Sequence, residues 1–449
     1  MTSRYQDDRD LIPAAGNGLL DRRTLLKTGL RFGVIAVPAV AAAAQASQDK
    51  FDPARPPWML KPGAAFTPYG SPSPHENEVV RFPAPNRVMR NSGASFTPLH
   101  LMEGSITPNG LHFERHHNGV PQIDPARHRL LIHGLVNKAL FFSVDDLLRY
   151  PLRSRICFIE CGGNSNAGWN NTPSQAQAGY FHGLVSNTEW TGIPLAVLLQ
   201  EAGVNHKARW VVAEGADAFA MDVSIPLEKA MDDAMVALYQ NGERLRPENG
   251  YPLRLVLPGW EGVTNVKWLR RLELREGPVM ARNETSRYTD LLPSGKARQF
   301  SFIMEAKSLI TSPSSGMVLK SGPGLYQITG LAWSGRGRIR EVQVSTDGGA
   351  SWAPAELQGP VLPMALTRFR IPWRWNGEPA VLKSRAVDET GYVQPERAAL
   401  IARRGRHGFY HYNAIVTWKV DGNGTVSHIY DEEKHEPQGN HIDIDTGWD

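Results

Sequence analysis

The residue type best suited to metal chemistry in this chain is a cysteine at the end of an apolar run. Residues 156–165 read I-C-F-I-E-C-G-G-N-S, and Cys161 stands directly before two glycines and Asn164. Glycines let the backbone approach a bulky ligand, and the amides and the asparagine can donate hydrogen bonds to it. The pattern predicts an exposed thiolate at a bend, which is a soft metal ligand. A buried apolar cysteine at a strand end is the plainer interpretation.

The number of cysteines restricts the remaining chemistry. The sequence contains Cys157 and Cys161 and no other cysteine, which is too few for a disulfide-stapled fold or a cysteine-rich zinc or iron-sulfur site. On an extended strand their Cα atoms would lie about 13 Å apart, beyond the reach of a disulfide. The sequence has no C-x-x-C-H motif, so we expect no covalently attached c-type haem on this chain.

Histidines and an arginine gather in the segment T-P-N-G-L-H-F-E-R-H-H at residues 107–117. His112 and His116 could share one face of a helix and hold zinc or copper. The prolines and glycines on both sides of the segment disfavour a helix. Arg115 would suit an anionic ligand, because a guanidinium forms charge-assisted hydrogen bonds.

These residues need a scaffold that brings distant segments together. From about residue 99 to 276 strand and helix patterns mix without repeated strand-helix-strand units, which predicts an α+β domain with mixed sheets. One expected helix begins at Ser143 and another ends at Gly203. The expected strands cover residues 129–136, 209–215, 252–259 and 266–274, and the expected helices cover residues 143–150 and 194–204.

After Gly277 the pattern becomes β-rich. Short strands alternate with turns between residues 325 and 394, and Asp347-Gly348 is a strong hairpin signal. We predict an all-β, immunoglobulin-like sandwich at residues 277–402. Residues 403–449 are predicted to form a tail without a core pattern. Its histidines are expected at the surface: His407, His411, His428, His435 and His441.

The N-terminus has the pattern of an export signal. The sequence D-R-R-T-L-L-K at 21–27 precedes an apolar run at 32–44. As a helix, this run is too short to cross roughly 30 Å of hydrocarbon. We therefore favour a twin-arginine signal peptide at residues 1–46 over a transmembrane helix, with an uncleaved anchor as an alternative. Residues 47–98, dense in proline and glycine, are predicted to form an extended arm.

Length and composition exclude other classes of protein. The 449 residues are 41% hydrophobic and 21% charged, with a formal net charge of +4, as in a soluble globular protein. The length predicts two domains. No cluster of lysine and arginine interleaves with aromatic residues, so we expect no nucleic-acid partner. We also expect no stable insertion into a membrane.

Four segments together resemble the sulfite oxidase family of molybdenum enzymes. Residues 107–117 are similar to the family's T-P-N…F-x-R-N-H, and E-C-G-G-N resembles its C-A-G-N loop. Residues 249–269 are similar to H-G-F-P-V-R-V-V-V-P-G…V-K-W-L, and Y-Q-I-T-G-L-A-W-S-G with the strands that follow resembles the dimerisation domain. The resemblance implies a sulfite-oxidase-type molybdopterin-binding domain at 99–276 and an immunoglobulin-like dimerisation domain at 277–402.

The resemblance also implies roles for individual residues. Cys161 would bind molybdenum, with the dithiolene of molybdopterin and oxo or hydroxo groups as the other ligands, and Arg115 would hold an anionic substrate. The residues implied to bind the cofactor are Asn109, Phe113, His117, Asn164, Asn249, Arg254, Asn265 and Lys267. A solvated strand edge is the alternative interpretation of the last four.

Departures from the family pattern narrow the resemblance. Ser165 and Asn166 stand where ordinary sulfite oxidases have arginine, and Met221 stands where a tyrosine is usual. In these respects the chain most resembles the molybdenum subunits of sulfane dehydrogenases from bacterial thiosulfate-oxidising Sox systems. That resemblance implies oxidation of sulfane sulfur on a carrier protein's cysteine, by oxo transfer from water, with electrons passed to a c-type cytochrome subunit.

The same resemblance implies a homodimer through the immunoglobulin-like domain, within a heterotetramer, and together with the export signal a periplasmic location. Three alternatives stay open. The chain could be a free sulfite dehydrogenase that produces sulfate, an oxo-removing reductase of the same fold, or a cofactor-free scaffold for the cytochrome. Oxo-removing relatives typically lack the dimerisation domain that this sequence is predicted to have.

Overall fold

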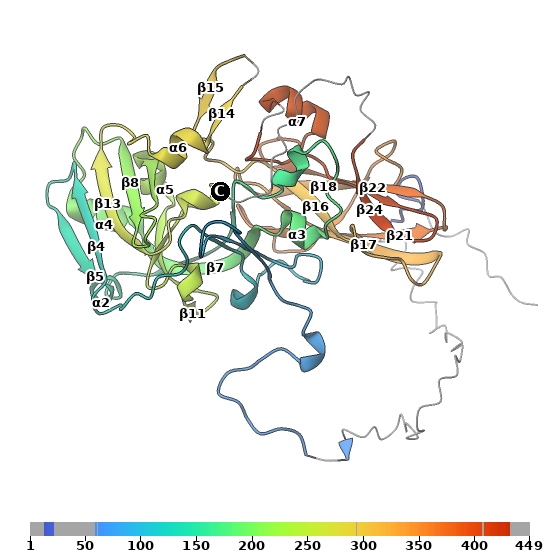
Figure 1. The fold of residues 1–449 in the computed structure, drawn as a ribbon, viewed down its shortest axis with the longest axis horizontal. Helices are drawn as coiled ribbons and strands as arrows, with labels where there is room; N and C mark the ends of the chain where they lie inside the picture. The colour runs from blue at the N-terminus through green and yellow to red at the C-terminus, as the bar shows by residue number, and fades with distance from the viewer. Residues whose placement is uncertain (1–12, 22–58, 61, 293, 406–407, 432–449) are drawn as a thin grey trace, which may run out of the picture.

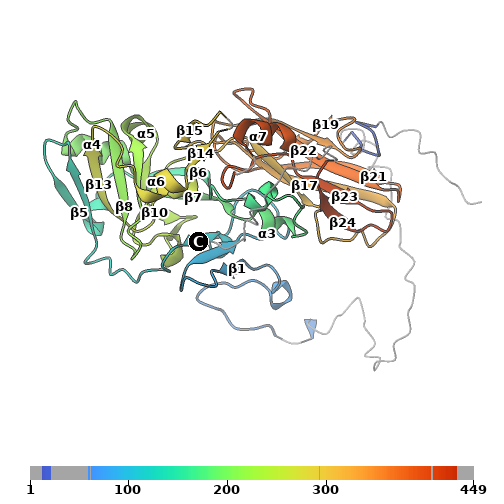
Figure 2. The same ribbon diagram turned by 45° about the horizontal axis from the view of Figure 1, so that its top comes forward.

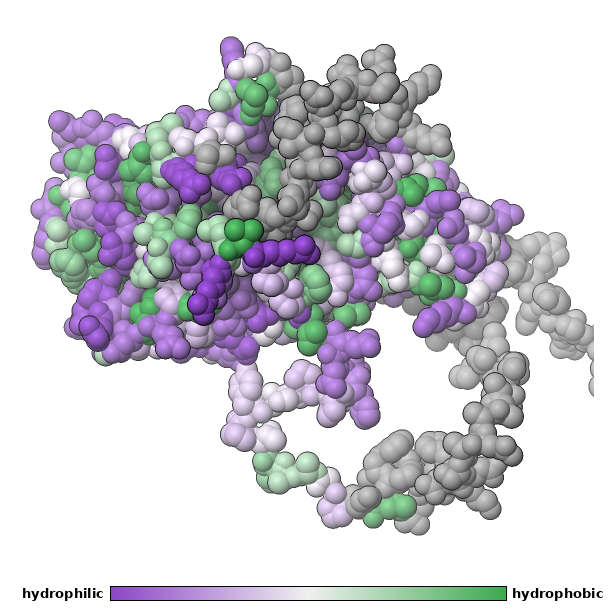
Figure 3. All heavy atoms as spheres, in the orientation of Figure 1, coloured by the Kyte–Doolittle hydropathy of each residue, from purple (hydrophilic) through white to green (hydrophobic). Residues whose placement is uncertain are grey.

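The computed structural model describes residues 13–21, 59–60, 62–292, 294–405 and 408–431. A mixed lobe of helices and strands lies beside a β-sandwich, and a small sheet lies below their junction (Figure 1). Hydrophilic residues cover most of the face drawn in Figure 3. Within the described residues, no helix is long and apolar enough to span a bilayer. The predicted twin-arginine motif and its apolar run lie outside the described residues.

The mixed lobe contains two five-stranded sheets. One has the order β11-β10-β7-β6, with β12 paired to β10, and the other has the order β5-β4-β13-β8-β9. Because β13 runs parallel to β4 and antiparallel to β8, the second sheet is mixed, as predicted. The strands are β4 (Arg129–Gly134), β5 (Leu140–Ser143), β6 (Arg153–Glu160), β7 (Val185–Pro194), β8 (Trp210–Gly215), β9 (Asp222–Pro226), β10 (Met235–Gln240), β11 (Glu243–Arg244), β12 (Arg254–Val256) and β13 (Leu269–Arg275).

Both predicted helices of this lobe form, each shorter than expected. Ser143 caps the first through a reciprocal pair of hydrogen bonds, in which Asp146 N donates to Ser143 Oγ (3.1 Å) and Ser143 N donates to Asp146 Oδ2 (2.9 Å). The second ends at Gly203, whose φ of +72° favours glycine. The helices are α2 (Val144–Leu147), α3 (Ala178–His182), α4 (Leu195–Ala202), α5 (Leu227–Asp232), α6 (Arg282–Ser286) and α7 (Arg397–Arg404).

The sandwich packs a four-stranded sheet, β16-β17-β21-β20, on a five-stranded sheet, β19-β18-β22-β23-β24. Its core contains the fully buried side chains of Trp333, Phe369, Trp373 and Trp418. The predicted Asp347 hairpin joins β18 to β19, through a loop longer than two residues. The strands are β16 (Lys307–Ser312), β17 (Gly324–Trp333), β18 (Ile339–Ser345), β19 (Ala353–Pro354), β20 (Glu356–Leu357), β21 (Thr367–Trp375), β22 (Ala380–Asp388), β23 (Thr417–Val420) and β24 (Val426–Ile429).

The sandwich begins and ends later than the sequence predicts. Its first strand is β16, and residues 277–306 contribute α6 and the hairpin of β14 (Thr289–Leu291) and β15 (Ala297–Gln299), which projects from the molecule in Figure 1 and lies between α6 and α7 in the view of Figure 2. Because β23 and β24 belong to the five-stranded sheet, the prediction of a coreless tail is wrong for residues 408–431. His411 and His428 are 5% and 3% exposed, so their predicted surface position is wrong. His407, His435 and His441 lie outside the described residues.

The predicted N-terminal arm is partly a sheet. Its strands β1 (Phe82–Pro85) and β2 (Gly93–Phe96) pair antiparallel, and β2 pairs with β3 (Glu114–His116). Within the histidine segment, His112 follows a 3-10 turn at Asn109–Leu111 and His116 lies in β3, so the two histidines do not share a helix. Residues 62–80 remain largely exposed, with a 3-10 turn at Pro74–Glu76.

Residues 13–21 dock on the sandwich, although they fall within the segment predicted to be a signal peptide. Leu19 is 0% exposed and bridges to Trp373 of β21. The backbone N of Arg374 donates to Gly18 O (2.7 Å), and Nε1 of Trp373 donates to Asn17 O (2.8 Å). A Cβ on Gly18 would lie 1.9 Å from Arg374 O, so the docked turn requires glycine at this position.

Replacing Leu19 with aspartate is expected to destabilise the full-length chain. Leu19 is fully buried in the sandwich core, and loss of a buried leucine side chain typically costs about 2–5 kcal/mol. A lower melting temperature by scanning calorimetry checks the prediction. Leu19→Met is the matched control, because a volume-conserving exchange should cost less than about 1.5 kcal/mol. Equal melting temperatures for Leu19→Asp and the unaltered chain would contradict the docked position.

Acid is expected to destabilise the sandwich through His428. Burial lowers the pKa of His428 to about 4, so the unfolded chain binds the extra proton between pH 6.5 and about 4. Stability is therefore present above pH 6.5 and falls as the pH drops through this window, by up to roughly 3 kcal/mol. Chemical unfolding at pH 7 and pH 4.5 should show a smaller loss for His428→Asn, which keeps a donor for Ser174 O. An identical loss in both proteins would contradict this assignment.

Candidate active site

The cysteine loop, residues 161–165, follows β6 and reverses direction directly after Cys161. Cys161 N donates to Leu184 O (2.9 Å), and Asn164 N donates to Cys161 O (2.9 Å). A Cβ on Gly162 would lie 2.4 Å from Glu261 Oε1 and 3.2 Å from Cε1 of Tyr288, so a larger residue here would force the buried Glu261 carboxylate to shift. Both cysteines are free.

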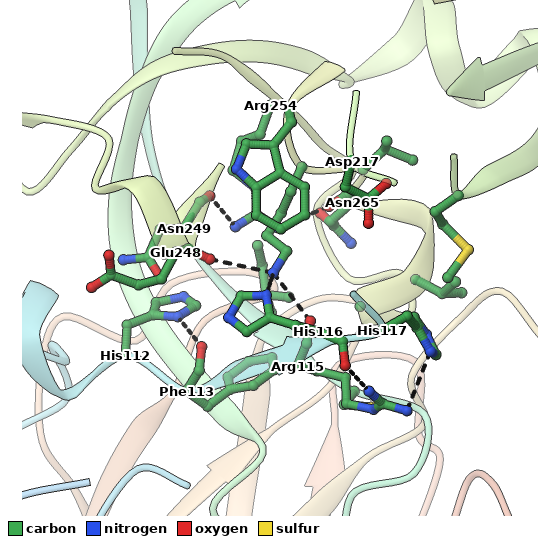
Figure 4. A pocket seen from close by; sticks show the side chains of 18 of the residues that line it. His112, Phe113, Arg115, His116, His117, Asp217, Glu248, Asn249, Arg254 and Asn265 are labelled. Atoms are coloured by element: carbon green, nitrogen blue, oxygen red, sulfur yellow. Dashed lines mark hydrogen bonds between the residues drawn. The ribbon is translucent and has the colours of Figure 1, made fainter. Parts of the chain in front are cut away.

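A pocket opens between the cysteine loop, β3 and residues 248–268 (Figure 4). It holds about 780 Å³ of space free of atoms, part of it open to solvent. The predicted site residues on its wall are Phe113, Arg115, His117, Cys161, Asn249, Arg254, Asn265 and Lys267. Also on the wall are His112 and His116, which the sequence suggested as zinc or copper ligands, and Met221, which stands where a tyrosine is usual. Asp217, Glu248, Trp268 and Tyr288 line the wall without a role assigned from the sequence.

The structure does not bring Asn109 and Asn164 to this pocket wall. Nδ2 of Asn109 donates to Gln240 O (2.9 Å), and its Oδ1 accepts from Asn241 (2.9 Å). Nδ2 of Asn164 donates to Glu160 Oε1 (2.9 Å). Both amides therefore hold loops in place, and their predicted contact with a cofactor has no geometric support.

Arg254 forms the deep, basic end of the pocket. It is 4% exposed, and its guanidinium donates to Asn249 O (2.9 Å) and Asn265 O (2.8 Å). The guanidinium also lies 4.9 Å from the centre of the Trp190 ring. Burial lowers the pKa of Arg254 to about 9. Because Asn249 and Asn265 are also buried, the alternative of a solvated strand edge is wrong.

Lys267 joins this basic end to β3. Its Nζ lies 2.7 Å from Nδ1 of His116 and donates to Arg115 O (3.1 Å) and Glu248 O (3.3 Å). Burial, followed by the positive charge of Arg254, holds the pKa of Lys267 well below its usual value. Figure 4 shows these bonds around His116 at the centre of the pocket. The lysine thus fixes the strand that carries Arg115.

Four buried polar atoms of the pocket have no hydrogen-bond partner among the described residues. They are His112 Nε2, Asp217 Oδ1, Asn249 Oδ1 and Arg254 Nε. Nδ1 of His112 faces Phe113 O at 2.9 Å, and burial lowers the pKa of His112 to about 3, so Nε2 is an acceptor. Since buried polar atoms are normally paired, the pocket fits a polar ring system that offers both donors and acceptors. A pterin has this character.

Arg115 lines the same pocket as Cys161, and both residues are partly exposed. Its guanidinium donates to Gly93 O (3.3 Å) and lies 3.4 Å from Nδ1 of His117. Burial, with the charge of Arg115, lowers the pKa of His117 to about 3. Burial raises the pKa of the Cys161 thiol, and the Gly163 amide and Arg115 oppose that rise. Lys267 and, more weakly, Arg287, which the sequence did not single out, also lower the pKa of His117 through their positive charges.

The alternative of a zinc or copper site finds no ligand set in the structure. In the parts of the chain that are described, no group of three or more histidine, cysteine, aspartate or glutamate side chains could hold a metal ion. His116 Nε2 already lies 2.8 Å from Glu114 Oε2. A metal at this site would need ligands from a cofactor in addition to Cys161.

Comparison with known proteins bears on both lobes. Residues 117–282 match the model of the oxidoreductase molybdopterin binding domain, and residues 298–418 match that of the Mo-co oxidoreductase dimerisation domain. The sulfane dehydrogenase SoxCD from Paracoccus pantotrophus has a solved structure that is 47% identical, with a TM-score of 0.81, over 84% of this chain and 97% of that one. The chain belongs to the sulfite oxidase family of molybdopterin oxidoreductases.

Other members of the sulfite oxidase family align over most of the chain. Mitochondrial sulfite oxidase of Mus musculus is 33% identical over 354 residues, which are 73% of this chain and 64% of the mouse enzyme. Sulfite oxidase of Gallus gallus is 30% identical over 326 residues, 67% of this chain and 70% of the chicken enzyme. The predicted family and the predicted fold class, a molybdopterin-binding α+β domain followed by a β-sandwich, are confirmed.

Proposed function

We propose that the chain is a molybdenum-dependent sulfane dehydrogenase, which oxidises thiosulfate-derived sulfane sulfur bound to a cysteine of a carrier protein. The observation that carries the proposal is the arrangement of one pocket. The partly exposed side chains of Cys161, Arg115 and Lys267 line it together with the buried side chains of Asn249 and Arg254. A metal ligand, an anion-binding group and a cofactor cradle thus share one space.

The residues around the pocket would hold molybdopterin, with Cys161 as the protein ligand of molybdenum. When bound, this group supplies a two-electron centre for oxo transfer. Arg254 and Lys267 are cationic donors suited to its phosphate. The unpartnered acceptors of His112 and Asn249 suit the donors of its ring. No haem is expected on this chain.

Arg115 would bind the oxygen atoms of the growing sulfur oxyanion. His117 remains neutral at physiological pH because its pKa is about 3, so it adds no charge and its ring packs on Phe219 at 4.4 Å. Each oxygen added to sulfur derives from one water and releases two protons and two electrons. A c-type cytochrome subunit would take the electrons, since the sequence has no haem-attachment motif.

Two substrates compete within this proposal. The similarity to the structure titled sulfane dehydrogenase SoxCD, and the uncharged Met221 on the pocket wall, favour sulfur on a carrier protein. The positive charges of Arg115 and Lys267 near His117, and the identity to mouse sulfite oxidase, favour free sulfite with sulfate as the product. We place carrier-bound sulfane sulfur first.

The proposal extends to assembly and location. The match of residues 298–418 to a dimerisation domain supports a homodimer through the sandwich, which would form a heterotetramer with two cytochrome subunits. The D-R-R-T-L-L-K motif at 21–27 supports export of the folded protein to the periplasm by the twin-arginine route.

Metal analysis followed by turnover measurements tests the proposal. The purified protein should contain about one molybdenum and one pterin per chain, whereas a cofactor-free scaffold would contain neither. Turnover of a persulfidated carrier protein is then compared with that of free sulfite, with cytochrome c reduction as the readout. A far higher kcat/KM for free sulfite would overturn the sulfane assignment in favour of sulfite oxidation.

A further inference from the structure

The residue before Cys161 carries a buried carboxylate that joins the two lobes. Glu160 is 1% exposed. Its Oε1 accepts from Asn164 Nδ2 (2.9 Å) and from Lys307 Nζ (3.3 Å), and its Oε2 accepts from Nε1 of Trp333 (2.6 Å). Asn164 belongs to the cysteine loop, whereas Lys307 and Trp333 lie on β16 and β17 of the sandwich. One side chain therefore links the loop to the other lobe.

Lys307 also contacts Ser165, which follows Cys161 in the sequence. Its Nζ donates to Ser165 Oγ (2.5 Å), and that oxygen lies 2.6 Å from Nδ1 of His182. Ser165 has a left-handed backbone, with φ of +66°, and is 2% exposed. The lysine of the sandwich thus contacts residues both before and after the cysteine.

The cost of burying this pair indicates a role beyond stability. Lys307 is 1% exposed and its carboxylate partner is equally buried. Replacing a buried ion pair with apolar residues of similar volume is often neutral or stabilising, whereas removing one partner is strongly destabilising. Apolar side chains would be enough to hold the two lobes together. The loop residues in this network are Glu160, Asn164 and Ser165, and all of them lie within four residues of Cys161 in the sequence.

We propose that Lys307 and Trp333 are positioning residues for Cys161, so that the sandwich sets the orientation of the sulfur that faces the cofactor. The proposal rests on Cys161 as the metal ligand, as in the proposed function. Groups that fix the orientation of a metal ligand typically change metal affinity or activity by roughly 10–100-fold. The lobe matched to a dimerisation domain would then act inside the active site of its own chain.

Three variants of the holoenzyme test this inference: Lys307→Met, Trp333→Phe and the double variant Glu160→Gln/Lys307→Met. The single variants should retain molybdenum near the level of the unaltered enzyme. Their molybdenum(V) electron paramagnetic resonance spectrum should shift or split, and kcat should fall about 10–100-fold. The double variant removes the uncompensated charge, so its melting temperature should recover while its spectrum and kcat remain altered.

Arg368→Met is the matched control, because Arg368 is also a cation of the sandwich that is 1% exposed. Its guanidinium donates to Thr311 Oγ1 (3.1 Å) and Gly104 O (2.9 Å), and not to the cysteine loop. This variant should lose stability and keep the spectrum. An unaltered spectrum and kcat in Lys307→Met and Trp333→Phe, or recovery of all readouts in the double variant, would overturn the inference. An enzyme without molybdenum would overturn the proposed function instead, and with it the premise here.

Discussion

Replacing Cys161 with serine is expected to abolish oxidation of every sulfur substrate while the chain stays folded. The side chain lines the pocket beside Arg115, and serine has nearly the same volume. Removing a group that only orients a metal ligand typically lowers activity by about 10–100-fold. Loss of the sulfur ligand itself should therefore lower kcat by more than about 100-fold. The measurements are turnover with a persulfidated carrier, the molybdenum(V) resonance spectrum and the melting temperature.

Cys157→Ser is the control for this variant, since it makes the same exchange four residues earlier. Cys157 is 0% exposed within the apolar surroundings of β6, and burial raises the pKa of its thiol to about 12. A hydroxyl there should reduce the free energy of unfolding by roughly 1–3 kcal/mol and leave the metal spectrum intact. A Cys161→Ser protein with an unchanged spectrum and unchanged turnover would contradict the assigned ligand.

Replacing Arg115 with glutamine is expected to impair free sulfite more than carrier-bound sulfur. Glutamine keeps a donor and loses the positive charge. Removing one partner of a buried, hydrogen-bonded charge pair typically costs about 2–5 kcal/mol, so kcat/KM for sulfite should fall about 30-fold or more. A neutral sulfane sulfur depends less on that charge until oxygen has been added to it.

Measuring kcat/KM for both substrates checks this difference. Arg270→Gln is the control, because Arg270 lies in the same lobe, is half exposed and pairs with Glu214 outside the pocket wall. The control should leave both values within about twofold, as exposed ion pairs contribute little. Equal losses of kcat/KM for the two substrates in Arg115→Gln would mean that the guanidinium supports the structure of the pocket and does not discriminate between substrates by their charge.

The parts of the fold that were predictable from sequence have local causes. The capping oxygen of Ser143 and the left-handed glycine at Gly203 marked helix ends correctly, because both act within one helical turn. β23 and the docked Leu19 were missed. A four-residue strand has too little pattern to recognise, and the partner of Leu19 lies more than three hundred residues away, on β21.

The site was predictable where a motif and a wall of the pocket coincide, as for Arg115, Cys161 and Lys267. A motif does not specify the direction of each side chain, which is why Asn164 was assigned to a cofactor although its amide bonds Glu160. Tyr288 follows α6, outside every motif, and reaches the pocket through tertiary packing alone. The motifs thus indicated most of the residues on the pocket wall, and missed the direction of Asn164 and the contribution of Tyr288.

Gly162 limits how this enzyme can diverge from its relatives. The wider family has alanine at the corresponding place in C-A-G-N, yet here a single added carbon would overlap Glu261 Oε1 and press on the ring of Tyr288. Alanine therefore fits at position 162 of this chain only if the Glu261 carboxylate and the Tyr288 ring move or are replaced by smaller groups. The effect of that one exchange thus depends on which residues already stand at positions 261 and 288, so that the same substitution can be tolerated in one relative and harmful in another.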